Sequence, residues 1–243
     1  ERLAEYSQNS LDCYHKYLEV SDIDATYVEL PYENTFMPAH FYKSPVAGDK
    51  APLMILTPGR DTFAEDTAWI YRQALKRGIH CLVYDGPGQG FALRMNGITF
   101  RHDIENVIPP IIDYCLENYD CIDEDNIILF GISFGGFLVP RAAIYDERVS
   151  MCIVDPGNIN WGGAFAERLA VIEKMPKRIR PAQLDFMLED YIYKHGATAD
   201  TICDELRKFD NTDIIDDLDC MTIVMDGTSE MTQGEAKVFY DML

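Results

Sequence analysis

The order of hydrophobic and polar positions predicts alternating strands and helices over most of the chain. Short, unbroken apolar runs, typical of strands buried on both faces, occupy residues 53–56, 79–84, 127–130, 149–154 and 221–225. Helical spacing of apolar residues fills most of the intervals, at residues 64–76, 103–117, 134–145 and 235–243. This alternation predicts the α/β class, with a mostly parallel, doubly wound sheet.

The first part of the chain follows a different pattern. Residues 1–19 have mixed helical spacing and predict an N-terminal helical segment. Residues 26–30 alternate between apolar and polar and are separated by a turn from residues 36–42, which predicts two antiparallel strands. Thr62 and Glu65 stand three residues apart, so we expect them to form a capping box at the next helix.

One interval between predicted strands is too long for a simple crossover. Residues 156–219 carry aromatic, basic and acidic stretches with helical spacing, and predict an inserted helical cap. The catalytic domain is then expected in two sequence pieces, residues 20–155 and 220–243. In an open α/β sheet, ligands bind beyond the carboxyl ends of the strands, so the residues there are the first candidates for a site.

Composition narrows the class of partner. The chain has 21 Lys and Arg against 41 Asp and Glu, a formal net charge of −20, which opposes binding to nucleic acid or to an anionic membrane surface. No apolar run approaches the roughly 18 residues needed to cross a bilayer, and the first thirty residues lack a basic stretch followed by an apolar one. The seven cysteines are scattered without a C-x-x-C pair. We expect a cytoplasmic protein with reduced cysteines.

The strongest chemical signal follows the apolar run 127–130. Gly131-Ile132-Ser133-Phe134-Gly135-Gly136 matches G-x-S-x-G, and an apolar helix follows it. In this strand–turn–helix context the serine sits on a sharp, strained turn that exposes its hydroxyl, and bulkier residues at the glycine positions would collide. Ser133 is therefore the predicted nucleophile. The alternative interpretation of residues 131–136 is an ordinary glycine-rich turn between a strand and a helix.

Two backbone N–H groups are candidates for an oxyanion hole. The Phe134 N–H lies at the start of the helix that follows the serine, where free N–H groups favour negative charge. The Arg60 N–H lies in the loop 57–61, which follows an earlier strand at the same sheet edge. A plain turn at Pro58-Gly59 is the alternative for this loop. The glycine-rich stretch 85–90 does not fit a dinucleotide fingerprint, because its spacing fails and no helix is expected directly after it.

A serine nucleophile needs a histidine base that a carboxylate orients. Glu230, in the loop after the apolar run 221–225, is the predicted acid, and Asp155, after the preceding strand, is the alternative acid or a substrate-binding residue. The expected chain order is serine, acid, histidine, but every histidine precedes Glu230. These are His15, His40, His80, His102 and His195. We therefore expect the C-terminal strand and the histidine loop to be missing from this chain.

These motifs together resemble a known family of α/β-hydrolases. The chain is similar to 2,6-dihydropseudooxynicotine hydrolase and to the fungal heptaketide hydrolases of pigment synthesis from about Thr26 onward. The resemblance rests on Pro58-Gly59-Arg60-Asp61 with Glu65, on residues 84–90, on Asp103 with Glu105, on 131–136 with 140–143, and on Asp155-Pro156-Gly157. It implies an α/β-hydrolase fold with Ser133 as nucleophile, Glu230 at the acid position and a helical cap after Asp155.

The resemblance leaves two kinds of reaction open. Relatives of this kind cleave C–C bonds beside a ketone, and similar proteins act as esterases or peptidases, so the fold does not decide the small-molecule substrate. Aromatic cap residues, Trp161 among them, would suit an aromatic substrate, although such residues are usually core. A noncatalytic scaffold that binds a small molecule or a partner protein is the other class of function. We expect no metal or cofactor, and a homodimer through an exposed sheet edge.

Overall fold

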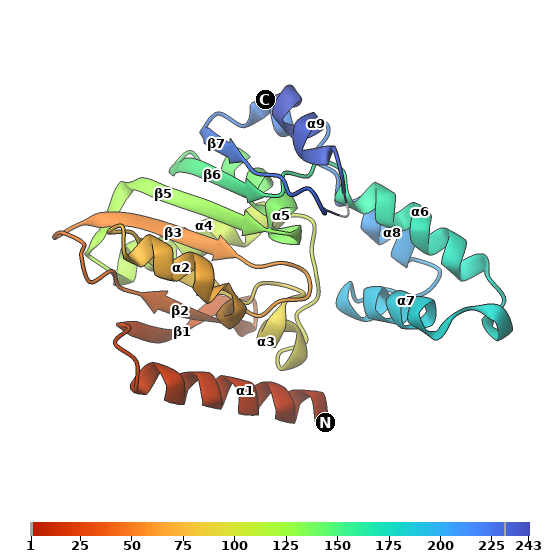
Figure 1. Cartoon of the computed structure of the whole chain (residues 1–243), viewed down its shortest axis with the longest axis horizontal. Helices are drawn as coiled ribbons and strands as arrows, with labels where there is room; N and C mark the ends of the chain where they lie inside the picture. Colours follow the sequence, from red (N-terminus) through yellow and green to blue (C-terminus); the bar gives the residue numbers. More distant parts are fainter. Residues whose placement is uncertain (1, 231) are drawn as a thin grey trace.

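Seven strands form one twisted sheet in the order β1-β2-β4-β3-β5-β6-β7. The computed structural model describes residues 2–230 and 232–243 of the chain (Figure 1). Strands β3 to β7 pair in parallel, whereas β1 with β2 and β2 with β4 are antiparallel. The strands are β1 (Ala25–Tyr32), β2 (Thr35–Tyr42), β3 (Ala51–Thr57), β4 (His80–Tyr84), β5 (Ile122–Ile132), β6 (Val149–Asp155) and β7 (Met221–Val224). The sheet confirms the predicted mostly parallel α/β-hydrolase fold.

Helices cover both faces of this sheet because its central strands are apolar on both sides. In β3, Leu53 and Ile55 pack into the cluster that includes the helices behind the sheet, whereas Met54 and Leu56 pack against α2 in front of it (Figure 1). The α-helices are α1 (Arg2–Glu19), α2 (Ala68–Leu75), α3 (Gly90–Arg94), α4 (Ile108–Asn118), α5 (Phe134–Ile144), α6 (Trp161–Lys174), α7 (Ala182–Lys194), α8 (Ile202–Arg207) and α9 (Glu235–Met242). Short 3-10 helices are η1 (Ala64–Thr67), η2 (Ile104–Asn106), η3 (Lys177–Ile179) and η4 (Ile215–Asp217).

Two local expectations were wrong. The predicted capping box of Thr62 and Glu65 does not form. Phe63 precedes η1 instead, and Asp66 accepts a hydrogen bond from the Phe63 N–H at 3.1 Å, which is one half of a capping box, since a phenylalanine side chain cannot accept the other bond. The predicted helix 103–117 is interrupted at Val107, where a 3-10 turn ends and α4 begins with two prolines in its first turn. Proline is favoured at the first positions of a helix, so it restarts the helix there.

Helices α6, α7 and α8 lie between β6 and β7 in sequence and project beyond the ends of the strands (Figure 1). The chain returns from them to the main body at Asn211, which is fully buried. Its side-chain amide donates to the Phe137 carbonyl oxygen of α5 at 2.9 Å, and its backbone N–H donates to the Ile159 carbonyl oxygen at 2.9 Å. These bonds fix both ends of the helical insertion next to α5. The domain boundaries proposed from the sequence stay a prediction.

Within the described residues, no helix combines the length and the apolar character needed to cross a membrane.

A largely buried ion pair ties α5 to η2. The Arg141 guanidinium donates from Nε and Nη2 to the two carboxylate oxygens of Glu105, each at 2.6 Å. The two side chains are 17% and 16% exposed. Removing one partner from such a pair costs more stability than removing one from an exposed pair, because the other charge is left partly buried and unpaired.

Replacing Arg141 with methionine is therefore expected to lower the free energy of unfolding by about 2 kcal/mol. Urea unfolding followed by circular dichroism measures this. Lys237→Met is the matched control, because Lys237 forms an exposed pair with Asp241 on α9 and its loss is expected to cost no more than about 0.5 kcal/mol. Equal effects of the two changes would contradict the argument.

Candidate functional site

Ser133 stands on a strained turn between β5 and α5. Its backbone angles are φ +55° and ψ −119°, a conformation that side-chain-bearing residues rarely adopt, and its side chain is exposed. A Cβ on Gly131 would lie 2.1 Å from the Gly135 carbonyl oxygen, so strand and helix pass in backbone contact there. The Ser133 N–H donates to the Asp155 carbonyl oxygen at 2.5 Å. The turn thus presents the hydroxyl at the carboxyl end of β5.

The loop after β3 lies directly beside this serine. A Cβ on Gly59 would lie 3.0 Å from Ser133 Cβ and 3.4 Å from Ser133 Oγ, so only glycine leaves this space open. Phe134 is the first residue of α5, and its N–H has no acceptor within the helix. Neither this N–H nor that of Arg60 donates to another group among residues 2–230 and 232–243. The structure therefore brings together the serine and both predicted oxyanion donors, whose role stays a prediction.

The glycine-rich stretch 85–90 positions the same loop. The Gln89 side-chain amide donates to the carbonyl oxygens of Pro58 at 2.5 Å and Gly59 at 3.2 Å, and its oxygen accepts from the Gly86 N–H at 3.0 Å. Gln89 is 1% exposed. Contrary to expectation, helix α3 begins directly after it, at Gly90. Sequence reasoning excluded a dinucleotide site here but missed this support for the loop.

Two carboxyl groups lie buried behind the loop. Asp85 accepts hydrogen bonds from the backbone N–H groups of Ala64 at 2.9 Å and Phe91 at 2.7 Å. Burial, with the nearby Asp85 charge, raises the pKa of Glu65 to about 8. Burial also raises the pKa of Asp85, although its two backbone donors oppose the shift. The Asp85 carboxylate thus ties the start of the segment that leads into α2 to the start of α3.

The two candidate acids occupy neighbouring strand ends. Asp155 is the last residue of β6, and burial raises the pKa of its carboxyl. Glu230 lies in the loop after β7, where its backbone N–H donates to the Gly227 carbonyl oxygen at 3.3 Å. No hydrogen bond joins either carboxylate to Ser133 or to a histidine among the described residues. The choice between the two acids stays open.

The five histidines occupy four different surroundings in the described part of the chain. The rings of His15 and His40 pack against each other where α1 meets β2. His80 accepts a hydrogen bond from the Ser44 N–H, and His102 lines an open groove. His195 lies in an aromatic cluster at the end of α7. None of them hydrogen-bonds to Ser133 in residues 2–230 and 232–243.

An aromatic cluster joins the serine turn to the helical insertion. The Trp161 ring, 7% exposed, lies 4.1 Å from the Phe134 ring between centroids. Its other neighbours are Phe165, Tyr191, His195 and Phe209. Trp161 thus packs against the residue that follows the nucleophile, and its predicted contact with substrate stays a prediction.

A charged network, missed in the sequence, links the loop after β3 to α7. Arg60 Nη1 donates to Asp190 at 2.7 Å and to Asp61 at 3.1 Å, and Lys194 binds both carboxylates. Burial opposes ionisation of Asp61, but the Lys194 bond and the Arg60 charge hold the pKa of Asp61 below its usual value. The Arg60 guanidinium also lies over the Tyr191 ring, 3.8 Å from its centroid. Charges four residues apart on a helix are common, so this network left no distinctive signal.

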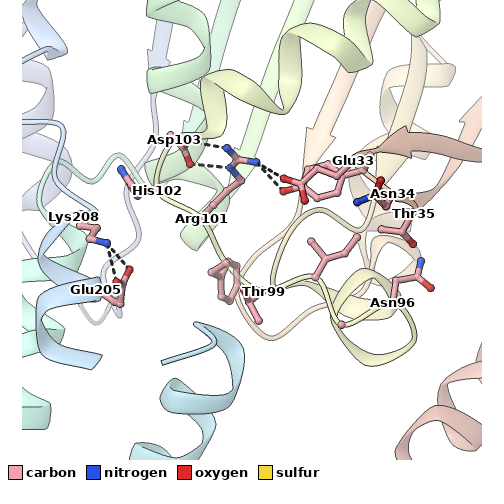
Figure 2. A pocket seen from close by; sticks show the side chains of 14 residues that line it. Glu33, Asn34, Thr35, Asn96, Thr99, Arg101, His102, Asp103, Glu205 and Lys208 are labelled. Atoms are coloured by element: carbon pink, nitrogen blue, oxygen red, sulfur yellow. Dashed lines mark hydrogen bonds and ion pairs between the residues drawn. The ribbon is translucent and has the colours of Figure 1, made fainter. Parts of the chain in front are cut away.

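A groove of about 530 Å³ opens on another side of the insertion (Figure 2). Arg101 lies between Asp103 and Glu33 on one wall, and the Glu205–Lys208 pair of α8 lies on the other. The groove does not include Ser133. Phe100 separates the two regions, since it lines the groove and its ring also contacts the Phe134 ring at 5.1 Å.

Comparison with known proteins places these features in context. The model of the alpha/beta hydrolase family matches residues 54–227. The chain is 30% identical over 172 residues to 20-hydroxy-prefusarin hydrolase FUS2 of Gibberella moniliformis, covering 65% of this chain and 40% of that protein. It is 33% identical over 172 residues to the hydrolase acrC of Aspergillus aculeatus, covering 63% and 40%. The crystal structure of a 2,6-dihydroxy-pseudo-oxynicotine hydrolase superimposes with a TM-score of 0.72 at 21% identity, covering 90% of this chain and 57% of that one. The chain thus spans less than half the length of these curated relatives.

Gly59→Ala is expected to slow modification of Ser133 by a fluorophosphonate at least tenfold, because the new methyl group would crowd the serine hydroxyl. Labelling rates followed by mass spectrometry measure this. Gly48→Ala is the control, since its Cβ meets no atom closer than 3.9 Å. Similar labelling rates in the two variants would show that the space beside Ser133 is not needed.

Glu65→Gln is expected to change how stability depends on pH. Because the folded-state pKa of Glu65 is raised, the folded chain holds a proton that the unfolded chain releases, so stability falls as pH rises from about 5 to about 8. The amide variant lacks this contribution and should melt about 3 °C or more above the parent at pH 8, with little difference at pH 5. Thermal melts at both pH values test this, with the exposed Glu117→Gln as control. A constant difference across pH would contradict the assignment.

Proposed function

The chain belongs to the alpha/beta hydrolase family, and on this premise we propose that it is a serine hydrolase with Ser133 as nucleophile. The observation that carries the proposal is the strained, exposed Ser133 at the N-terminus of α5, beside the Gly59 loop. The hydrolase names of its relatives support the same class of reaction. A strained conformation at an exposed nucleophile is a feature typical of active sites.

In the proposed reaction, Ser133 Oγ attacks a carbonyl carbon of a small substrate and loses its proton to a base. The negative charge that develops on the carbonyl oxygen is stabilised by the N–H groups of Phe134 and Arg60, and each such donor contributes roughly 10²- to 10³-fold to the rate. The leaving group departs with a proton, and water then hydrolyses the acyl-enzyme. Glu230, or Asp155 as the alternative, orients the base. The base is not assigned to any of the five histidines.

The bond that is cleaved is either an ester or amide, or a C–C bond beside a ketone. In the second case the same attack expels a carbanion, so the substrate must carry a group that stabilises that charge before it is protonated. The aromatic cluster around Trp161 and Phe134 supports an aromatic or ketone-containing substrate. Hydrolysis of a phenyl ester compared with a β-diketone distinguishes the two reactions.

A noncatalytic scaffold is the second candidate function. It is favoured by one observation, that none of the histidines in the described part of the chain forms a hydrogen bond with Ser133. In this case the site would bind a small molecule or a partner protein without turnover.

We further propose a homodimer formed through β7, with a cytoplasmic location. β7 is the last strand in the sheet order, and Met221 and Ile223 on it are 64% and 44% exposed. An exposed apolar edge strand is prone to pair with another chain.

The decisive experiment is intact-mass measurement before and after treatment with a fluorophosphonate. One label is expected on the parent chain, none on Ser133→Ala, and one on Ser150→Ala, because the Ser150 hydroxyl donates to the Ile127 carbonyl oxygen away from the turn. A folded parent chain that stays unlabelled would overturn the enzyme proposal in favour of the binding scaffold.

A further inference from the structure

Arg60 has two buried hydrogen-bond donors without a partner. Its side chain is only 8% exposed, and its Nη1 group makes both of its ion pairs, with Asp61 and Asp190. Its Nε and Nη2 groups are buried and have no acceptor in residues 2–230 and 232–243. Leaving a buried donor without a partner costs about 1–3 kcal/mol, and more for a charged group. Such donors therefore point to an acceptor that is not part of the described chain.

Other arginines of the same molecule show what this edge of the guanidinium binds. Arg101, Arg141 and Arg148 each use Nε and Nη2 together to hold both oxygens of one carboxylate, at distances between 2.6 and 2.8 Å. Figure 2 shows this arrangement for Arg101 and Asp103. The fork matches a planar pair of oxygen atoms, which is why arginine rather than lysine recognises carboxylates. In Arg60 the same fork is free.

Unpartnered polar atoms and aromatic rings both lie in the region of Arg60. Five of the eleven buried side-chain nitrogen and oxygen atoms without a partner in the described chain belong to Arg60, Thr62 and His195. Burial and the positive charge of Arg60 lower the pKa of His195 to about 3, so its ring is neutral and offers one donor and one acceptor. Tyr191 and Phe209 flank the His195 ring, with centroids 6.0 and 5.1 Å away. The free donors of Arg60 thus lie in a largely aromatic environment.

This region adjoins the nucleophile. Arg60 follows Gly59, whose Cβ position would lie 3.4 Å from Ser133 Oγ and 3.3 Å from the unpartnered Thr62 Oγ1. The Arg60 guanidinium reaches from there to α7, where it lies over Tyr191. One side chain therefore spans from the serine turn to the helical insertion.

We propose that the Nε–Nη2 edge of Arg60 binds the carboxylate of a small aromatic acid, and so selects substrates that carry this group near the bond attacked by Ser133. The inference rests on the proposed function in that the acid is a substrate or product of that site. Arg60 and Lys194 are already balanced by Asp61 and Asp190, so the ion pairs do not require the free edge. Because the donors are closed to solvent, entry of the acid requires Tyr191 or its neighbours on α7 to move.

Isothermal titration calorimetry with benzoate and with benzamide tests this recognition. Benzoate is expected to bind the parent chain at least tenfold more tightly than benzamide, and Arg60→Lys is expected to remove this preference. Lysine keeps the positive charge, but it has no fork. Arg148→Lys is the matched control, because its fork is already occupied by Asp146, and it should retain the preference.

A second readout separates this inference from the proposed function. Benzoate should also slow fluorophosphonate labelling of Ser133 in the parent chain and not in Arg60→Lys. If Ser133 is labelled but benzoate binds no better than benzamide, the carboxylate site is overturned and the serine hydrolase stands. If benzoate binds through Arg60 while Ser133 stays unlabelled, the carboxylate site stands and the enzyme proposal fails. Loss of the preference in Arg148→Lys as well would assign the effect to a general consequence of replacing an arginine, not to the free edge of Arg60, and would overturn the inference.

Discussion

The whole site depends on backbone-to-backbone contact around the serine turn. Three glycines, Gly131, Gly135 and Gly136, each lie where a Cβ would come within 2.2 Å of a carbonyl oxygen. These oxygens lie in α5, at the end of β3 and in the turn after β6, respectively. These contacts fix the distances between the ends of three parallel strands. The strained backbone of Ser133 persists because these surrounding contacts leave it no relaxed alternative.

Around this turn, buried polar side chains replace regular secondary structure as the source of rigidity. The Gln89 side chain holds the loop after β3, and the Asp85 side chain holds the start of the following segment. Both form hydrogen bonds to backbone groups, and both side chains are 1% exposed. In the proposed reaction this loop carries the Arg60 N–H toward the reacting oxygen, and such support would preorganise the donor so that it stabilises charge without a reorganisation cost. The glycine-rich stretch 85–90 thus serves the site from behind.

The helical insertion is tied to the site by aromatic packing and by charge. Trp161 packs against Phe134, and Arg60 binds Asp190 on α7. A movement of α7 would therefore change the surroundings of Arg60 and of the loop 57–61 that lies beside Ser133. This coupling gives the insertion a direct physical route to influence which molecules reach Ser133.

Local patterns were enough to predict the sheet, the serine turn and its neighbouring loop. Unbroken apolar runs identify strands buried on both faces. The motif G-x-S-x-G after such a run spans only a few residues, so it can be recognised without knowledge of distant contacts. The start of η1 after Phe63 and the break at Val107 were missed because the start of a helix depends on small differences among adjacent residues. The sequence alone therefore determined the architecture and the candidate nucleophile. Only the tertiary structure decided what Arg60 and His195 face. Arg60 meets Asp190, which lies 130 residues away in the sequence, and the ionisation of His195 is set by its burial, which no local pattern encodes.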